Sequence, residues 1–317
     1  MAKKENLKIG WIGAGRMGFE MALRLAKGGC DLTVYNRTRA KAEPLAQYGA
    51  NIADKVSDLA GCDVVFCMVS TYADVKEVVA GKGGLLSQAK KTAKGKRGAP
   101  RILIECSSIS LEGSAELRAL LAEHGTSMLA APVSGNAKVI KAGKLSFVCS
   151  GPKAVFDEVS PLLKLIAPAA SYVGEGELAR IVKICHNVFL GVVIQSLCEI
   201  TILAQKAGVP RHAFLEFINQ SVMGSVFSRY KTPALVNLDF KVTFTPTLLR
   251  KDLDLGLDAG RKFEVPLPLA SITRDLIQSM IGSGLSEQDF ATLLLQQARL
   301  SGIELKPENV SVGDGLA

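Results

Sequence analysis

Residues 8–18 read Lys-Ile-Gly-Trp-Ile-Gly-Ala-Gly-Arg-Met-Gly, an apolar run that breaks into three spaced glycines. Residues 7–12 predict a strand, and the apolar spacing within 16–28 predicts a helix. Between them, Gly13, Gly15 and Gly18 form G-x-G-x-x-G, which in this context is typical of dinucleotide binding. The first glycine takes the turn, the second lets the backbone approach a pyrophosphate, and the third lets the helix pack closely. We expect the helix start, at Arg16 and Met17, to present its N–H groups to the phosphates.

The end of the next apolar run, Leu32–Tyr35, indicates which dinucleotide binds. It is followed by Asn36, Arg37 and Thr38, 23 residues after Gly13. An NAD-specific protein usually carries Asp or Glu here to accept from the ribose 2′-hydroxyl, whereas these three residues offer donors suited to a 2′-phosphate. Taken alone, Arg37 could be an ordinary solvated loop residue. At this spacing it predicts NADP, with NADPH preferred over NADH.

Composition places the chain among ordinary globular proteins with room for two domains. It has 317 residues, 48% of them apolar, and a net charge of +8. Most of the positive excess sits in one acid-free stretch, 90–101, at Lys90, Lys91, Lys94, Lys96, Arg97 and Arg101. A single basic segment without aromatic residues is more typical of a solvated connection than of a nucleic-acid site. We therefore expect no nucleic-acid partner.

The cysteines, the beginning of the sequence and the longest apolar segment bear on location. Seven cysteines without a CxxC pair predict buried thiols in a reducing compartment. The first predicted strand begins too early for a signal peptide to precede it. Gln195, Ser196, Glu199 and Thr201 interrupt the apolar segment 188–204, which favours a buried helix over a membrane span. We expect a cytoplasmic protein with no membrane contact and no metal site.

The first half of the chain alternates strands and helices, the pattern of an α/β doubly wound parallel sheet, or Rossmann fold. Strands are predicted at 7–12, 31–35, 63–69, 101–106, 127–133, 145–150 and 171–173. Helices are predicted between them at 16–28, 38–48, 71–80, 110–124 and 152–166. Beyond Gly174 the strand signals end, and the helices predicted are 177–207, 210–221, 224–230, 245–262, 267–282 and 286–297. The sequence thus predicts a dinucleotide-binding domain over 1–173 and an all-α domain over 174–317, joined by a long interdomain helix, with a mobile tail from Lys306.

Further motifs follow the glycine turn in a fixed order. Residues 131–135 read Ala-Pro-Val-Ser-Gly, and 143–146 read Gly-Lys-Leu-Ser. Residues 183–187 read Lys-Ile-Cys-His-Asn, and 249–255 read Leu-Arg-Lys-Asp-Leu-Asp-Leu. Over roughly 7–297, this series resembles the β-hydroxyacid dehydrogenases, which include 3-hydroxyisobutyrate dehydrogenase and the tartronate, glyoxylate and succinic semialdehyde reductases. The resemblance implies hydride transfer between nicotinamide and a short 3- or 4-hydroxy acid or its semialdehyde.

The resemblance also implies roles for individual residues. Lys183 would be the general acid and base, with Asn187 orienting the substrate from the same helical face four residues on. Ser134 and Gly135 would hold the substrate carboxylate, with Asn136 beside them. Lys251 would pair with that carboxylate or contact the cofactor. Further cofactor contacts are implied after two strands, at Met68, Val69, Ser70 and Ser107. Asp252 has no evident chemical task.

Departures from the family pattern leave the substrate open. Asn136 stands where a second glycine is usual, and His186 replaces a common asparagine. Asn136 adds donors that could favour a hydroxylated substrate. Family resemblance also predicts a homodimer or homotetramer through the helical domain.

Two other functions share this architecture. An imine reductase usually has a different residue where Lys183 stands, and a non-catalytic nucleotide-binding scaffold would be expected to lose that lysine.

Overall fold

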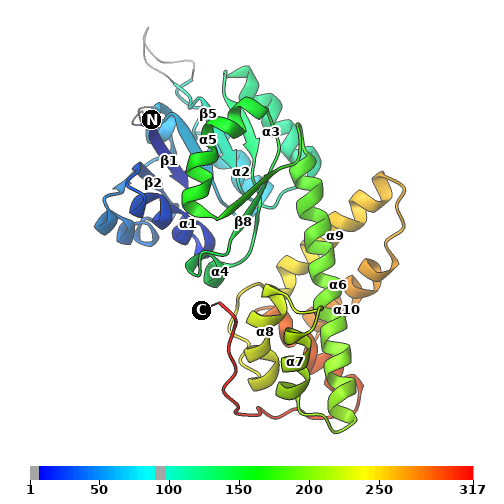
Figure 1. Cartoon of the computed structure of the whole chain (residues 1–317). Helices are drawn as coiled ribbons and strands as arrows, with labels where there is room; N and C mark the ends of the chain where they lie inside the picture. Colours follow the sequence, from blue (N-terminus) through cyan, green and yellow to red (C-terminus); the bar gives the residue numbers. More distant parts are fainter. Residues whose placement is uncertain (1–6, 90–97, 317) are drawn as a thin grey trace. The chain divides into compact units, whose positions relative to one another are not determined.

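The computed structural model describes residues 7–89 and 98–316 (Figure 1). Lys90, Lys91, Lys94, Lys96 and Arg97 of the basic stretch therefore lie outside the described residues. The chain divides into two compact units, Met1–Lys183 and Ile184–Ala317. A single helix, α6 (Leu178–Lys206), contains residues of both.

The first unit is built on a parallel six-stranded sheet with the strand order β3-β2-β1-β4-β5-β6. This is the doubly wound α/β arrangement that the sequence predicts. The strands are β1 (Lys8–Ile12), β2 (Asp31–Tyr35), β3 (Asn51–Ile52), β4 (Val64–Cys67), β5 (Ile102–Glu105) and β6 (Ser127–Ala130). The helices of this unit are α1 (Arg16–Lys27), α2 (Tyr72–Ala80), α3 (Leu111–Glu123), α4 (Ala137–Lys141) and α5 (Lys153–Ile166).

The alternation of side chains along the strands gives this sheet two separate cores. Trp11 and Phe66 stack at 5.2 Å between ring centroids and pack with Met21 of α1 on one face. Ile12 and Val65 pack on the other face with residues of α2 and α3. Because apolar side chains cover both faces of the sheet, polar groups that bind a ligand are expected at the carboxyl ends of its strands.

The prediction of a single strand over 127–133 is wrong, because the strand ends at Ala130. Pro132 has no N–H to continue a ladder with β5. The chain turns there, and β7 (Val133–Ser134) pairs with β8 (Ser146–Cys149) in a second sheet of order β7-β8-β9, completed by β9 (Ala169–Tyr172). The short helix α4 between β7 and β8 was not predicted.

The predicted helix 38–48 is also wrong. This segment forms two 3-10 helices, η1 (Arg39–Lys41) and η2 (Glu43–Tyr48), and the second ends at Gly49 with φ +87°. The short β3 and the 3-10 helix η3 (Val56–Gly61) follow, and neither was predicted.

The second unit is helical, as predicted. Its helices beyond α6 are α7 (Arg211–Gln220), α8 (Val226–Asn237), α9 (Pro246–Lys262), α10 (Pro268–Gly282), η4 (Phe290–Thr292) and α11 (Leu293–Leu300). Two predicted limits are wrong. Pro233 signals an early end for the helix at 224–230, but buried Leu235 and Val236 behind it keep α8 helical to Asn237. The helix expected at 286–297 begins only after buried Asp289, whose side chain caps η4.

By length and composition, α6 is apolar enough to cross a membrane, and 44% of its most apolar stretch is buried within the fold. Core helices of soluble proteins meet the same criterion. Ile194, Cys198 and Ile202 of α6 belong to the core of the second unit. These contacts match the buried helix that the sequence predicts.

The tail from Lys306 is held by hydrogen bonds, so the prediction of a mobile tail is wrong. Buried Arg211 donates to the carbonyl of Lys306 at 2.6 Å and to that of Val236 at 2.7 Å. Glu308 accepts from the backbone N–H groups of Arg211 at 2.7 Å and His212 at 2.9 Å. Glu308 thereby supplies the carboxylate cap that α7 lacks at Pro210, its own N-cap residue. The polar composition of the tail does not reveal these partners.

We predict that Glu308→Gln lowers the free energy of unfolding by about 1–2 kcal/mol at pH 7. Burial opposes ionisation of Glu308, but hydrogen bonds from His212 and Arg211 hold its pKa below the ordinary glutamate value. The charged carboxylate therefore stabilises the fold above that ordinary value, and the stabilisation is lost as the pH falls through the lowered pKa. Urea unfolding at pH 7 and at acidic pH measures it, with exposed Glu304→Gln as the control. An equal loss at both pH values would contradict the capping role.

Candidate functional site

The glycine turn after β1 has the geometry that its spacing predicts. Gly13 has φ +98°, and a Cβ placed there would lie 2.2 Å from the Met68 carbonyl oxygen. A Cβ at Gly18 would lie 1.9 Å from the Gly13 carbonyl oxygen. Gly15 differs, because nothing lies within 4 Å of its added Cβ. The two outer glycines are required by close packing, and the middle one leaves open space at the helix start where a phosphate group fits.

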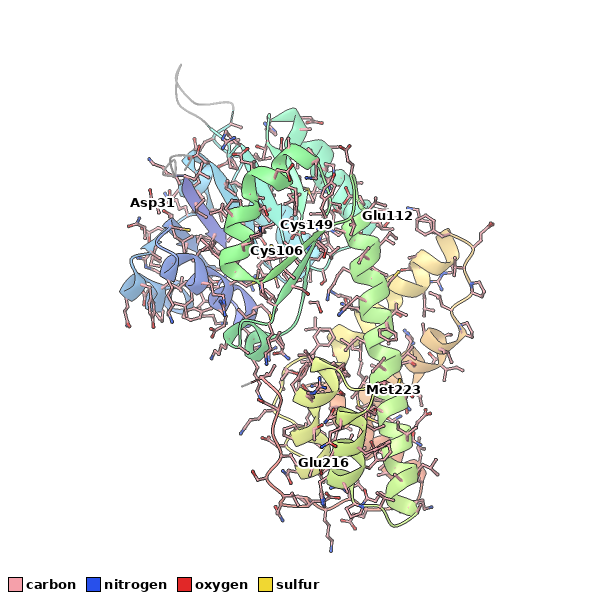
Figure 2. All side chains as sticks on the ribbon, viewed as in Figure 1. Asp31, Cys106, Glu112, Cys149, Glu216 and Met223 are labelled. Carbon is pink, nitrogen blue, oxygen red and sulfur yellow. The ribbon has the colours of Figure 1, made fainter. Side chains whose placement is uncertain are left out.

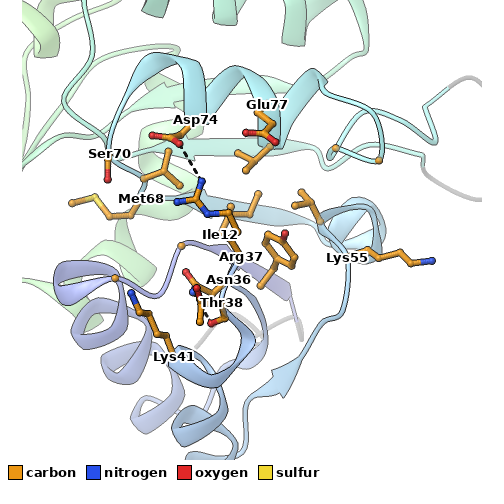
Figure 3. Close-up of a pocket in the computed structure, with 18 of the residues that line it drawn as sticks. Ile12, Asn36, Arg37, Thr38, Lys41, Lys55, Met68, Ser70, Asp74 and Glu77 are labelled. Atoms are coloured by element: carbon orange, nitrogen blue, oxygen red, sulfur yellow. Dashed lines mark hydrogen bonds and ion pairs between the residues drawn. The ribbon is translucent and has the colours of Figure 1, made fainter.

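A cavity of about 550 Å³ lies over this turn, entirely within the first unit (Figure 3). Its walls come from the ends of β1, β2 and β4, from α2 and the segment that follows it, and from the segment that leads into η3. The predicted cofactor residues that line it are Gly13, Gly15, Asn36, Arg37, Thr38, Met68, Val69 and Ser70. The predicted cofactor residues outside its lining are Arg16, Met17, Gly18, Ser107 and, in the second unit, Lys251.

Asn36 is engaged by the backbone of the turn. Its Oδ1 accepts from the Ala14 N–H at 2.8 Å, and its Nδ2 donates to the Thr38 carbonyl at 2.8 Å. The amide therefore ties the end of β2 to the glycine turn. This contact assigns Asn36 a shaping role, beside the phosphate-donor role that the sequence predicts.

Arg37 presents a guanidinium at the cavity, and its side chain is 85% exposed. Its Nη1 lies 3.8 Å from Asp74 Oδ1 on α2, an ion pair at the distance limit (Figure 3). The other Asp74 oxygen accepts from the Thr71 N–H and hydroxyl in the cap of α2. Such an exposed pair holds the guanidinium weakly, so Arg37 can be drawn to a stronger anion.

Sequence reasoning missed the charged residues that complete the cavity wall. Lys41 lies on η1 beside Thr38 in Figure 3 and adds a second cation on the β2 side. The other missed charges are Asp54, Lys55, Asp74, Glu77 and Lys82. The N-R-T-x-x-K spacing of 36–41 could have indicated Lys41. The others come from α2, from the segment after it and from the segment before η3, and no local pattern in the sequence shows that they reach the cavity.

Ser107 stands behind the cavity wall, fully buried after β5. Its Oγ accepts from the Val69 N–H at 3.0 Å, and Val69 lines the cavity. In this structure Ser107 therefore supports a lining residue.

The predicted substrate residues at 134–136 form a tight turn in the first unit. Ser134 ends β7, opposite Ser146 of β8. Gly135 has φ +136°, and a Cβ there would come within 2.8 Å of Val139. Asn136 caps α4, since its Oδ1 accepts from the Val139 N–H at 3.1 Å. The Asn136 oxygen is thus committed to the helix.

Lys183 and Asn187 both lie on α6, one helical turn apart. Lys183 is partly buried at the end of the first unit, and Asn187, in the second, is 5% exposed. The Asn187 Nδ2 donates to Asp252 Oδ2 at 2.6 Å, and its Oδ1 lies 2.9 Å from His186 Nδ1. Asp252, which the sequence left without a task, fixes the Asn187 amide.

Lys251 also lies near Asp252 in the second unit. Its Nζ is 3.3 Å from Asp252 Oδ1, an oxygen that is buried without a hydrogen-bond partner. The geometry at that distance gives an ion pair without a hydrogen bond. The structure thus brings Asn187, Lys251 and Asp252 together on α6 and α9.

The N-terminal and C-terminal parts of this chain each match the model of a known protein family. Residues 8–174 match the family model of the NAD binding domain of 6-phosphogluconate dehydrogenase. Residues 177–296 match the model described as NAD-binding of NADP-dependent 3-hydroxyisobutyrate dehydrogenase. A crystal structure of 3-hydroxyisobutyrate dehydrogenase from Salmonella typhimurium superposes with a TM-score of 0.80 at 25% identity, covering 91% of this chain and 99% of that one.

Curated relatives match over nearly the whole chain. Glyoxylate/succinic semialdehyde reductase 2 of Arabidopsis thaliana is 28% identical, over 91% of this chain and 79% of its own. The 2-(hydroxymethyl)glutarate dehydrogenase of Eubacterium barkeri is 29% identical over 95% and 98%. An uncharacterized oxidoreductase of Shewanella frigidimarina is 32% identical over 87% and 94%. The chain therefore belongs to the β-hydroxyacid dehydrogenase family of NAD(P)-dependent oxidoreductases.

Proposed function

We propose that the protein is an NADP-dependent enzyme that interconverts a short 3- or 4-hydroxy acid and its semialdehyde. The observation that carries the cofactor choice is the absence of an acidic side chain at the end of β2, where Asn36, Arg37 and Thr38 line the cavity. A carboxylate at this position would repel a 2′-phosphate. Arg37 and Lys41 give that phosphate two cations.

The cavity also suits the rest of the cofactor. Open space at Gly15 and the N–H groups at the start of α1 fit a pyrophosphate. Met68, Val69 and Ser70 supply the opposite wall, and Gly18 keeps α1 close to the turn. When bound, the nicotinamide supplies or accepts the hydride.

We predict that Arg37→Ala weakens NADPH binding by about 10–100-fold, since a charge-assisted hydrogen bond to a phosphate is worth about 1.5–3 kcal/mol. NADH, which lacks the 2′-phosphate, should lose less than threefold. Fluorescence titration of each cofactor measures both. Arg39→Ala is the matched control, because Arg39 begins η1 two residues further on and does not line the cavity, although its partner Asp54 does. Unchanged NADPH affinity in Arg37→Ala would refute the assignment.

Lys183 is proposed as the proton donor in reduction and the base in oxidation. Hydride addition to an aldehyde leaves an alkoxide, and a nearby ammonium can stabilise that charge and then protonate the oxygen. Asn187 would orient the same substrate oxygen, with its amide held by Asp252. Lys251, whose Nζ lies 3.3 Å from Asp252 Oδ1, is proposed as a cation for the substrate carboxylate or the cofactor.

The carboxylate end of the substrate is assigned to the turn after β7. The Ser134 hydroxyl and the Gly135 N–H are donors suited to it, and the absent side chain at Gly135 permits close approach. Asn136 keeps its Nδ2 as a donor while its Oδ1 caps α4. This arrangement supports a small carboxylate-bearing substrate.

The test of this function is NADPH oxidation across glyoxylate and the succinic, malonic, methylmalonic and tartronic semialdehydes, run beside a panel of cyclic imines. We expect turnover with at least one semialdehyde and none with imines. An imine reductase from Myxococcus stipitatus shares the fold at 23% identity and a TM-score of 0.58, so turnover of imines alone would favour that alternative. The second alternative is a non-catalytic nucleotide-binding scaffold, which predicts NADPH binding with no turnover. Two relatives are named cytokine-like nuclear factor N-PAC, and this chain spans about half of their length.

The remaining assignments are proposals of the same kind. The domain limits 1–173 and 174–317, a cytoplasmic location and a homodimer or homotetramer fit the family. One relative carries the description chloroplastic. Size-exclusion chromatography with light scattering would give the oligomeric state, with a monomer contradicting the proposal.

A further inference from the structure

The start of α6 carries a buried arginine, Arg180, that has no role in the proposed reaction. Arg180 is 1% exposed, and its guanidinium forms an ion pair with Glu105 at the end of β5, which is 0% exposed. The same guanidinium donates to the Ser107 carbonyl at 2.6 Å and to Ser114 Oγ at 3.1 Å. All of these residues belong to the first unit. Arg180 thus fastens α6 to the carboxyl end of the central sheet.

The network continues from Arg180 to the cofactor cavity. Glu105 Oε1 accepts from the Ser107 N–H at 2.8 Å, so Ser107 is held at its N–H by Glu105 and at its carbonyl by Arg180. The Ser107 hydroxyl in turn accepts from the Val69 N–H, and Val69 lines the cavity. Two hydrogen-bonded steps therefore join Arg180 to the wall that faces the cofactor.

In the other direction, Arg180 precedes Lys183 by three residues on α6. Residues at this spacing are neighbours on the helix surface, so the grip on Arg180 sets the position and rotation of the turn that carries the Lys183 amine. The Arg180 guanidinium is thus hydrogen-bonded to Ser107, which supports the cofactor wall. Arg180 also belongs to the same helix as Lys183, the proposed proton donor.

We infer that Arg180, with Glu105, is a positioning residue for hydride and proton transfer. It holds the turn of α6 that carries Lys183, and through Ser107 and Val69 it holds the wall of the cofactor cavity. The inference rests on the proposed function. A buried ion pair is a poor source of stability, because well-packed apolar residues of similar volume often serve as well or better. What apolar residues cannot reproduce is the hold on both the N–H and the carbonyl of Ser107.

The test variant is Glu105→Met with Arg180→Met, which removes both buried charges together and so avoids an unpaired one. The matched control is Arg118→Met with Glu177→Met. That second ion pair, at 2.7 Å, also holds the start of α6, with Arg118 bonded to the Gly176 carbonyl, but among the described residues it forms no hydrogen bond to Ser107. The readouts are the NADPH dissociation constant, kcat and the primary deuterium isotope effect with deuterated NADPH. A smaller folded fraction lowers the apparent kcat but does not move the isotope effect.

For the test variant we expect at least fivefold weaker NADPH binding, at least 20-fold lower kcat and an isotope effect that rises because hydride transfer becomes rate-limiting. The control should stay within twofold of wild type in all three. If the test variant matches the control, the inference is overturned. Should the test variant fail to fold, Arg180→Lys decides, because the single ammonium nitrogen can pair with Glu105 but cannot occupy the three separate positions from which the guanidinium nitrogens reach Glu105, Ser107 and Ser114. Arg180→Lys with wild-type constants overturns the inference.

The failure of the proposed function gives a different result. Wild-type protein would then turn over no semialdehyde, while the NADPH dissociation constants of the two double variants would still be compared. Weaker binding in the test variant alone would keep the Ser107–Val69 link, and equal binding would overturn it.

Discussion

Replacing Lys183 with methionine is expected to lower kcat for semialdehyde reduction by about 10²–10⁴-fold, the range that general acid catalysis contributes. The alkoxide formed by hydride addition would lose both its proton donor and the positive charge that stabilises it. NADPH binding should change by less than threefold, because the cavity over the glycine turn does not include Lys183. Steady-state kinetics and NADPH titration of the same preparation measure the two effects.

Lys183→Arg separates charge from proton transfer. The guanidinium keeps the positive charge but does not release its proton at neutral pH, so this variant should stay within about tenfold of Lys183→Met. Turnover near the wild-type rate in Lys183→Met would remove the lysine from the mechanism.

The largest loss of stability is expected from Lys231→Met in the second unit. Lys231 is 2% exposed and Asp289 is 1% exposed, with 2.5 Å between Nζ and Oδ1. Asp289 also accepts from the Thr243 N–H and hydroxyl and from the Ala291 N–H, so it joins α8, the 238–245 loop and η4. Removing the lysine leaves a buried carboxylate unpaired, which typically costs about 3–5 kcal/mol.

Urea unfolding at pH 7 measures that loss, with Lys241→Met as the control because Lys241 is 84% exposed and pairs with exposed Asp239. Burial opposes ionisation of Asp289, yet the Lys231 ammonium holds the pKa of Asp289 below the ordinary aspartate value. The wild-type pair therefore stabilises the fold above that ordinary value and is lost as the pH falls through the lowered pKa. Adding Asp289→Asn to Lys231→Met should restore part of the loss. A loss below 1 kcal/mol in the single variant would contradict the account.

The sequence predicts the parts of the fold whose signals are local. The glycine turn, the alternation of strands and helices and the change to helices after Gly174 all depend on residues close in the chain. Three features depend on distant partners instead. Beyond Pro132 the chain pairs with β8 in a second sheet, and α8 passes Pro233 because Leu235 is needed in the core. The tail is held because the backbone N–H groups of Arg211 and His212 donate hydrogen bonds to Glu308. Figure 2 shows the described side chains of both units.

The candidate site divides in the same way. Residues of the cofactor turn and of the β2 and β4 ends follow from motif spacing. Lys41 and Asp74 reach the cavity from η1 and α2, and the bond between Asn187 and Asp252 joins two helices far apart in the chain. The pairing of Arg180 with Glu105 has no local signal in the sequence, because the two residues lie 75 positions apart in the chain.

The central claim is tested most directly by the destination of the hydride. Purified protein would be supplied with NADPH carrying deuterium at the nicotinamide C4 and with the semialdehyde that the panel selects, and the product would be read by mass spectrometry and NMR. We predict one deuterium on the carbinol carbon of a hydroxy acid, formed by wild type and not by Lys183→Met. Tight NADPH binding with no deuterium transferred to any carbonyl substrate would contradict the enzyme and leave a nucleotide-binding scaffold.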